Sequence, residues 1–407
     1  MNAIICGGGI AGLTLAWWLD RYGWEVLIVE RAPALRDQGY AIDFFGSGYD
    51  VAELMGLVPQ LRETRYPIDE VAYVNRDGHQ VSRLDYQAFA QQVDGRLVGL
   101  LTRGDLERVL FGALSDRVHV RFGLSIDAVT PTGDQVTVTL TDGDRQRADL
   151  LIGADGIHSR VRELVFGAER WFLRDLGYHT AAYVFTDDVL CDHARGRVLM
   201  VTAPGRLAGI YPFGDGKVAS LFAHRSSQPA LPADPRATLR RIYADLGWMA
   251  DRALARCPQP PALYYDQVAQ IEMPRWSRGR VALIGDACQA VSLLAGQGAS
   301  MAMGGAYVLA AELGASADVA TALARYEARV KPVIQRQQAA ARRIATWFVP
   351  PSRWRMAARD AVLRLADLPR LGWLLRPLLS PGMDSVVPRS AAAPPMPSHA
   401  RAQGTRG

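Results

Sequence analysis

The sequence has little cysteine and no cluster of basic residues, and each shortage excludes a class of protein. Its four cysteines form no Cys-x-x-Cys pair, so we expect reduced thiols in a cytoplasmic protein. We expect no segment that spans a bilayer, and the N-terminus lacks the basic segment of a signal peptide. The formal net charge is +5, but the arginines are scattered. We therefore expect neither a membrane nor a nucleic acid as partner.

Motifs for catalysis by the protein's own groups are missing as well. The chain contains no Gly-x-Ser-x-Gly motif for a serine nucleophile, and its histidines and cysteines do not have the spacing of metal ligands. We therefore expect no metal site. These absences agree with a protein in which a bound organic cofactor supplies the chemistry.

A glycine-rich turn near the N-terminus points to such a cofactor. The apolar run Asn2–Cys6 predicts a short buried strand, and a helix is expected to begin near Ile10. Gly7 allows the tight turn between them, Gly9 leaves room for a pyrophosphate, and Gly12 lets helix and strand pack closely. The helix N-terminus then offers unpaired N–H groups and a positive dipole end to phosphates.

An acidic residue completes this dinucleotide pattern. The next predicted strand, Glu25–Val29, ends at Glu30. A carboxylate there accepts both hydroxyls of an adenosine ribose and disfavours a 2′-phosphate, so FAD or NAD fits better than NADP. The alternative is a glycine-rich turn in an ordinary α/β protein, but the strand, the helix and Glu30 together weigh against it.

Two later segments repeat the change from an apolar strand to a glycine-bearing turn and then to a helical pattern. The second covers residues 150–162 and includes Asp155 and Gly156; the third covers residues 281–287, with Gly285 and Asp286, and continues into Gly296, Gln297 and Gly298. One such segment would be weak evidence. Three of them, in this order and spacing, indicate a bound FAD.

The strand and helix signals alternate between two domains, as a length of 407 residues leads us to expect. The strand signals at Thr180–Phe185, Arg197–Val201, Ala208–Pro212 and Val218–His224 predict an antiparallel sheet with one face open to a ligand. We expect an α/β fold with a Rossmann-like FAD-binding domain (1–65, 99–170 and 277–330) interleaved with an antiparallel-sheet substrate domain (66–98 and 171–276). C-terminal helices (331–380), interrupted by Pro332 and residues 350–351, and a disordered tail (381–407) are expected to follow.

With its three motifs the chain resembles the FAD-dependent aromatic hydroxylases, the single-component flavoprotein monooxygenases built like p-hydroxybenzoate hydroxylase. The similarity is greatest to the tetracycline-inactivating and natural-product monooxygenases. It implies FAD as cofactor, NADPH or NADH as transient co-substrate, and O2 and a small molecule as reactants. It also implies a set of cofactor-binding residues: Gly7, Gly9, Ile10, Ala11, Gly12, Glu30, Arg31, Arg36, Asp43, Arg103, Asp155, Gly156, Gly285, Asp286, Gly296, Gln297 and Gly298.

The resemblance assigns separate roles within this set. Arg103 matches the arginine of an Arg-x-x-Leu helix start and is expected to reach the FAD phosphates, whereas Asp286 is expected to bind the ribityl hydroxyls. The Asp155-Gly156 pair is linked with both FAD and NAD(P)H. Arg36 and Asp43 keep the spacing of a nicotinamide-contacting arginine and an FAD-contacting aspartate, and the loops 39–42 and 296–298 are expected to face the isoalloxazine ring.

Structural roles remain open for several of these residues. Arg103 could pair with Asp105 or Glu107 on a helix surface, Asp155 and Asp286 could cap helices, and Arg36 and Asp43 could be solvated loop charges. Two residues of the predicted antiparallel sheet are candidates for catalysis. His224 is either a base or a satisfied polar group at the sheet edge, and Tyr211 either approaches the flavin or belongs to the core.

The implied activity is insertion of one oxygen atom from O2 into a bulky apolar aromatic or polyketide-like molecule. NAD(P)H would reduce FAD, O2 would add at C4a, and the distal oxygen of the hydroperoxide would pass to an electron-rich carbon. The sequence departs from the family pattern at two places. Cys288-Gln289 replaces Ala-His, and Ser292-Leu293 replaces a pair of prolines whose carbonyl lies where the flavin peroxide forms. Leu293 lacks the fixed φ of proline.

Rival functions remain. A flavin-dependent halogenase is rejected because its Trp-x-Trp-x-Ile-Pro motif is missing. The lost prolines motivate a flavin-bound cyclase or dehydrogenase that does not use O2. A binding protein without enzymatic activity is a third reading. The basic amphipathic segment Arg353–Leu379 either packs over the substrate domain or touches a membrane surface.

Overall fold

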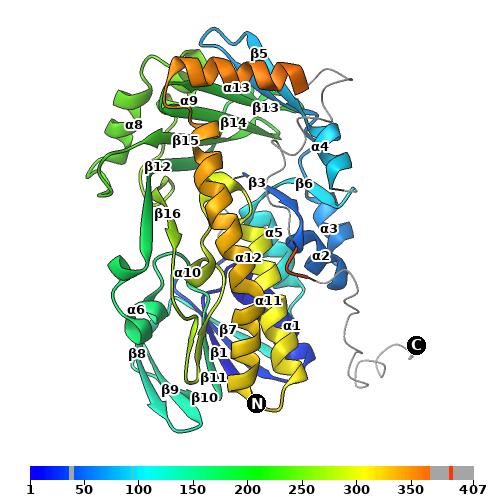
Figure 1. Cartoon of the computed structure of the whole chain (residues 1–407), viewed down its shortest axis with the longest axis vertical. Helices are drawn as coiled ribbons and strands as arrows, with labels where there is room; N and C mark the ends of the chain where they lie inside the picture. Colours follow the sequence, from blue (N-terminus) through cyan, green and yellow to red (C-terminus); the bar gives the residue numbers. More distant parts are fainter. Residues whose placement is uncertain (36–40, 94, 367–384, 388–407) are drawn as a thin grey trace.

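The computed structural model describes residues 1–35, 41–93, 95–366 and 385–387. The molecule is elongated, with a parallel sheet and its helices in one half and a seven-stranded sheet in the other (Figure 1). A long helix, α12, runs between the two halves. Among the described residues, no helix combines the length and the apolar character needed to cross a membrane.

The first half contains a six-stranded sheet in the order β17-β18-β11-β1-β2-β7. Its strands are β1 (Asn2–Cys6), β2 (Glu25–Glu30), β7 (Val118–Phe122), β11 (Leu150–Gly153), β17 (Ser277–Arg278) and β18 (Val281–Leu283). All neighbours are parallel except the edge pair β17–β18. Short runs of Ile, Val and Leu form the central strands because both faces are covered by protein.

Helices cover this sheet and connect it to the other half. They are α1 (Ile10–Arg21), α2 (Ser47–Leu54), α3 (Val58–Glu63), α5 (Arg103–Gly112), α6 (Arg160–Phe166), α10 (Asp286–Gln289), α11 (Gly298–Ala315) and α12 (Val319–Phe348), with short 3-10 turns η1 (Glu169–Trp171) and η2 (Leu293–Ala295). Helix α1 packs against α11, where Trp18 and Tyr307 meet edge to face with ring centroids 4.9 Å apart.

The second half is built on a seven-stranded sheet in the order β16-β12-β15-β14-β13-β4-β5. Its strands are β4 (Glu70–Val74), β5 (Gln80–Asp85), β12 (Leu173–Thr186), β13 (Arg197–Ala203), β14 (Arg206–Gly214), β15 (Lys217–Arg225) and β16 (Tyr264–Ile271). The four predicted strands are all present, within β12, β13, β14 and β15. The sheet departs from the antiparallel pattern only where β4 joins β13 in parallel.

Smaller elements surround the two main sheets. Strand β9 (Gln135–Leu140) forms a three-stranded antiparallel sheet with β8 (Ile126–Thr132) and β10 (Arg145–Ala148). Strands β3 (Ala41–Phe45) and β6 (Leu97–Thr102) form a two-stranded sheet between the halves. The helices α4 (Tyr86–Gln92), α7 (Asp188–His193), α8 (Pro235–Tyr243), α9 (Trp248–Ala255) and α13 (Arg353–Ala366) belong to the second half.

One C-terminal element differs from the sequence-based expectation. Pro332 was expected to interrupt a helix, yet α12 continues through it. The proline is exposed while Tyr326, Val330 and Ile334 are buried on the opposite side, so tertiary packing outweighs the lost backbone hydrogen bond. Helix α13 packs over β5, as one of the two readings of this segment predicted.

The predicted disordered tail is described only at residues 385–387, and these three pack against α2. Ser385 donates a hydrogen bond from Oγ to Asp50 Oδ2 at 2.6 Å, and Val387 is buried. Ser385 and the backbone N–H of Val386 therefore have partners on α2, and the disorder expected for 381–407 stays a prediction. The remainder of 381–407 lies outside the described residues.

Candidate active site

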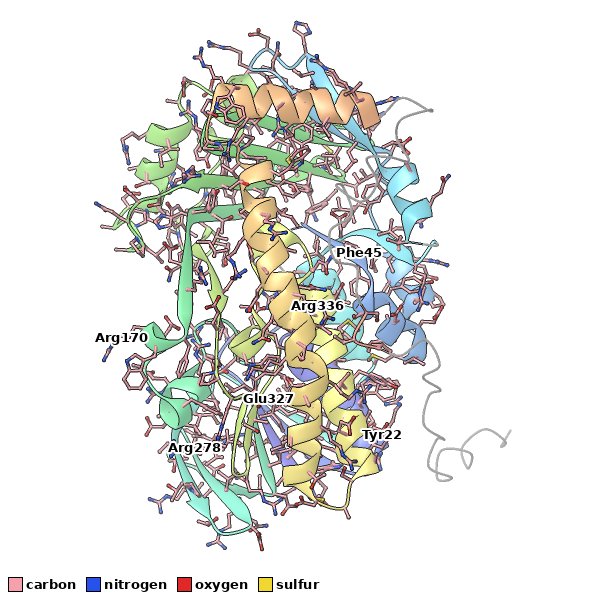
Figure 2. The ribbon with its side chains drawn as sticks, in the orientation of Figure 1. Tyr22, Phe45, Arg170, Arg278, Glu327 and Arg336 are labelled. Atoms are coloured by element: carbon pink, nitrogen blue, oxygen red, sulfur yellow. The ribbon has the colours of Figure 1, made fainter. Side chains whose placement is uncertain are left out.

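A cavity of about 900 Å³ lies between the two halves and is lined by residues from both. Figure 2 labels Phe45, one of the lining residues, between the parallel sheet and the seven-stranded sheet. Most residues assigned to the cofactor from the sequence line it: Gly7, Gly9, Ile10, Ala11, Glu30, Arg31, Asp43, Arg103, Asp155, Asp286, Gly296, Gln297 and Gly298. Gly12, Gly156 and Gly285 are not among the lining residues, and Arg36 is outside the described residues.

The glycine turn after β1 has the geometry expected from the sequence. Gly7 has a φ of +113°, and a Cβ there would lie 2.3 Å from the carbonyl oxygen of Ala154. A Cβ on Gly12 would lie 2.0 Å from the carbonyl oxygen of Gly7. Neither position accepts a side chain, so strand and helix approach closely. Gly9 is the N-cap of α1 and provides no side-chain hydrogen bond, which leaves the helix N-terminus facing the cavity.

Glu30 is fixed at the end of β2 by backbone donors. Its Oε2 accepts a hydrogen bond from the Gly8 N–H at 2.7 Å, and its Oε1 accepts one from the Ala32 N–H at 2.8 Å. Each oxygen keeps further acceptor capacity, because a carboxylate has about four lone-pair positions. The side chain is therefore held in place where a ribose diol could approach it.

Arg103 begins α5, whose N-terminus is closed by a capping box between Thr102 and Asp105. Its Nε donates to Glu107 Oε1 at 2.9 Å, so one of the ion pairs considered from the sequence does form. Both partners line the cavity rather than an outer surface. Across the cavity, burial raises the pKa of Asp286, and the charge of Arg103 opposes that rise.

Asp155 has the capping role that was considered from the sequence, and it also lines the cavity. Its Oδ1 accepts from Ser159 Oγ at 2.5 Å, while its Oδ2 accepts from the backbone N–H groups of Arg160 and Val161 at the start of α6. Gly156, with a φ of +84°, makes the turn that allows this arrangement.

The third motif brings a second helix N-terminus to the cavity. Gly285 lies against α1, and a Cβ there would be 2.7 Å from the Cβ of Ala11. Gln297 is the N-cap of α11 and supplies no side-chain cap. The N-termini of α1 and α11 therefore both present backbone N–H groups to one cavity.

The two departures from the family pattern lie in different places. Cys288 and Gln289 are buried behind the cavity, where Gln289 Nε2 donates to the Tyr326 hydroxyl of α12 at 2.6 Å. Burial also raises the pKa of the Cys288 thiol. Ser292 and Leu293, in contrast, line the cavity. Of the two replacements, only Ser292-Leu293 can therefore change a direct contact with the cofactor or the substrate.

Of the two candidates for catalysis, Tyr211 lines the cavity and His224 does not. His224 shares its face of β15 with Phe222, which packs beneath α8 and α9. Its Nδ1 lies 3.2 Å from the hydroxyl of Tyr243. Burial, followed by the neighbouring His179, lowers the pKa of His224 to about 4. His224 is therefore a buried neutral side chain, and the structure gives no support to a role as base.

The end of the cavity under the seven-stranded sheet is mostly apolar and aromatic. Its lining includes Ile68, Val71, Tyr73, Leu84, Leu100, Val198, Met200, Leu207, Tyr211 and Val268. Sequence reasoning missed a second wall, which α12 supplies with Gln337, Ala341, Ile344, Trp347 and Phe348. The apolar positions of α12 recur at helical spacing, a signal for burial that does not specify what is buried against them.

Sequence reasoning also missed His158 at the rim of the cavity. Its Nε2 lies 3.2 Å from Asp266 Oδ2 of β16, and its Nδ1 lies 3.1 Å from Glu169. Hydrogen bonding to Asp266 is the main reason that the pKa of His158 rises to about 9. The His158–Asp266 pair joins the loop after β11 to the seven-stranded sheet. No pattern in the sequence relates these two positions.

Comparison with known proteins identifies the family. A family model described as "FAD binding domain" matches residues 1–341. A flavin-dependent monooxygenase from an unidentified prokaryote is 32% identical over 343 residues, which cover 83% of this chain and 87% of that protein.

Two solved structures have the same architecture. The tetracycline destructase Tet(55) is similar with a TM-score of 0.77 and 29% identity, over 89% of this chain and 94% of that one. HpxO of Klebsiella pneumoniae, in complex with FAD and uric acid, is similar with a TM-score of 0.74 and 26% identity, over 89% and 92% of the two chains. The chain belongs to the FAD-binding domain family and is an FAD-dependent monooxygenase.

Proposed function

We propose that the protein uses NADPH or NADH and O2 to insert one oxygen atom into a bulky, apolar aromatic or polyketide-like molecule. The observation that carries this proposal is one cavity with two chemically different ends. One end has the glycine turn, two helix N-termini, Glu30 and Arg103, and the other is lined by aromatic and aliphatic side chains.

The first end fits FAD. The two uncapped helix N-termini suit a diphosphate, and the anchored Glu30 carboxylate suits a ribose diol. Glycines occupy the positions where a side chain would fill the space or push the strand and helix apart. Residues 296–298 and Ala41–Ile42 also line the cavity, and we propose that they contact the ring system.

When bound, FAD would supply the redox chemistry, taking a hydride from NAD(P)H and activating O2. The protein would supply position and exclusion of water. Tyr73, Met200 and Leu207 of the sheet and Trp347 of α12 enclose the second end of the cavity. A substrate held there would be oriented by shape and kept from solvent, which protects a reactive oxygen donor.

The relatives support the substrate class only in outline. The names of the similar structures refer to tetracycline, a polycyclic molecule, and to uric acid, a small heteroaromatic one. The apolar lining of the substrate end of the cavity favours the larger type here.

One observation favours a second candidate. Leu293 lines the cavity where relatives are expected to have proline, so oxygen activation could be lost while FAD binding is kept. The protein would then be a flavin-bound cyclase or dehydrogenase that turns over without O2.

The test is a comparison of turnover with and without oxygen. The purified FAD-loaded protein is reduced anaerobically with NADPH or NADH in a stopped-flow instrument, then mixed with aerated buffer and a panel of polycyclic phenols and polyketides. We expect at least one compound to accelerate NAD(P)H oxidation and to appear as a product that requires oxygen. Product formation under strict anaerobiosis would instead favour the cyclase or dehydrogenase.

A further inference from the structure

A groove outside the main cavity brings arginine and tryptophan side chains together. It lies between the C-terminal end of α12 and helix α13, in the half of the molecule that contains the seven-stranded sheet, and has a volume of about 250 Å³ (Figure 1). Nine described residues line it, and none of them is acidic. Five of the nine carry a charge or a large ring: Arg343, Trp347, Trp354, Arg355 and Arg359.

Two of these arginines are exposed and have no counter-charge. Among the residues that the structure describes, no carboxylate pairs with Arg343 of α12 or with Arg355 of α13. The guanidinium carbon of Arg355 lies 5.1 Å from the centre of the Trp354 ring. Trp354 is itself 67% exposed, which is unusual for so large an apolar side chain. The groove is therefore positively charged and has a flat aromatic surface beside the charge.

The third arginine, Arg359, adds positive charge from inside the protein. Its Nη2 donates to Asp360 Oδ1 at 2.7 Å and to Thr202 Oγ1 at 2.9 Å, and its guanidinium carbon lies 4.2 Å from the centre of the Tyr73 ring. Its Nη1 is buried and has no hydrogen-bond partner among the described residues. Because a buried donor without a partner is unfavourable, an anion nearby would offset part of this cost by charge attraction.

The combination of these side chains selects the chemistry of a ligand. A planar guanidinium group binds a carboxylate through two parallel hydrogen bonds, and an indole ring stacks on a flat aromatic ligand. The volume is below the range of drug-sized ligand sites, so the groove suits a molecule of one or two rings.

We propose that this groove is a second binding site, which takes a flat aromatic carboxylic acid of one or two rings. The carboxylate contacts Arg343 and Arg355, and the ring stacks on Trp354. The site is separate from the FAD end and the substrate end of the main cavity. Arg343 and Trp347 line both the groove and the main cavity, whereas Trp354, Arg355 and Arg359 line the groove alone.

This division of residues decides the design of the test. Binding is measured by isothermal titration calorimetry with the oxidised, FAD-loaded protein in the absence of NAD(P)H, so the result does not depend on the proposed oxygenation. The probes are 2-naphthoate and its neutral counterpart 2-naphthamide, which have the same rings and differ in charge. The variants are Arg355→Gln and Trp354→Ala, which alter the groove and leave the lining of the main cavity unchanged.

We expect the wild-type protein to bind 2-naphthoate at least about five-fold more tightly than 2-naphthamide, because two exposed arginines each add a modest attraction. The preference should shrink when NaCl is raised from about 0.05 M to about 0.5 M. Arg355→Gln should reduce the preference to about two-fold or less. Trp354→Ala should instead weaken the binding of both probes by a similar factor, since it removes the stacking surface and keeps the charge.

Arg353→Gln is the matched control. Arg353 is exposed on the same helix and does not line the groove, so its loss removes the same charge and should leave the preference intact. Arg355→Lys keeps the charge without the planar fork and should retain part of the preference.

Four results would overturn the proposal. They are equal binding of the two probes by the wild type, no binding of either probe, equal effects of Arg355→Gln and Arg353→Gln, and 2-naphthoate binding that neither groove variant changes. The last result would place the acid in the main cavity. Vesicles of phosphatidylglycerol test the alternative of a lipid surface: co-sedimentation that depends on Arg355, in a protein that does not bind 2-naphthoate, would replace the small acid with a membrane.

Discussion

At the scale of single residues, Glu30 is the side chain on which cofactor affinity should depend most clearly. In Glu30→Gln one of the two backbone donors, Gly8 N–H or Ala32 N–H, faces an amide NH2 instead of an oxygen. The negative acceptor for a ribose is lost as well. Hydrogen bonds to charged groups contribute roughly 1.5–3 kcal/mol, so we expect the Kd for FAD to rise at least about ten-fold.

The measurement is titration of the apoprotein with FAD, followed by flavin fluorescence. Glu25→Gln is the matched control, because Glu25 is exposed at the other end of β2. An equal effect of both substitutions would mean that Glu30 has no special relation to the cofactor.

The pKa shifts of two histidines, His224 and His158, predict opposite responses of protein stability to pH. The pKa of His224 is lowered to about 4 from an ordinary value near 6.5. Between these values the unfolded chain binds a proton that the folded protein refuses, so the free energy of unfolding should fall as pH drops from 6.5 to 4, by about 3 kcal/mol. Urea unfolding across this range should show a flatter dependence for His224→Gln.

The pKa of His158 is raised to about 9, mainly by Asp266. Protonated His158 should therefore contribute fully to the free energy of unfolding below pH 6.5, and this contribution should disappear as pH rises through 9. Because this side chain is about half exposed, the effect should be small. His158→Gln should remove the alkaline part of the pH dependence and leave the acidic part. If His224→Gln and His158→Gln altered the pH dependence of unfolding in the same pH range, the assignment of the acidic part to His224 and of the alkaline part to His158 would be contradicted.

The residue types of the cofactor end were predictable from the sequence, whereas several side-chain partners were not. Glycine is required where a Cβ would meet backbone, as at Gly7 and Gly12, so a glycine pattern carries geometric information. The Asp43–Tyr86 contact joins positions 43 residues apart. Their proximity depends on how β3 and α4 pack, which no local pattern encodes.

At the scale of elements, the contact between β1 and α1 should tolerate no side chain. A Cβ at position 12 would lie 2.0 Å from the Gly7 carbonyl oxygen, so Gly12→Ala has to move the turn that faces the cavity. We expect a loss of stability of about 3 kcal/mol or more together with loss of bound FAD. Thermal unfolding and the flavin absorbance of the purified variant measure the two effects.

Gly112→Ala is the control for this prediction. Gly112 is exposed at the end of α5, with nothing within 4 Å of a built Cβ. The substitution should be neutral or should stabilise the protein by up to about 1 kcal/mol. A Gly12→Ala variant as stable and as yellow as this control would disprove the close contact.

Helix α12 shows where reasoning from single elements fails. Pro332 has a strong local tendency to end a helix, and the sequence therefore predicts a break there. In the structure the buried side of α12 packs along α11 and reaches the substrate end of the cavity. This packing is a property of the assembled fold, so neither the continuity of the helix nor its role as a wall follows from its sequence.

At the scale of the whole molecule, the convergence of three distant motifs was predictable from strand topology. The turns after β1, β11 and β18 meet because these strands are neighbours in one parallel sheet, and their C-terminal ends lie at the same edge. The position of the second half over that edge was not predictable in the same way. It depends on β3, β6 and α12, which join the halves through contacts between residues far apart in the chain.

The most direct test of the account is the origin of the oxygen atom in the product. The FAD-loaded protein is supplied with NAD(P)H and a hydroxylated polycyclic substrate under ¹⁸O2, and the product is analysed by mass spectrometry. The account predicts a product heavier by one ¹⁸O atom, formed only when both NAD(P)H and O2 are present. A product that contains no ¹⁸O, or that forms equally without O2, would contradict it.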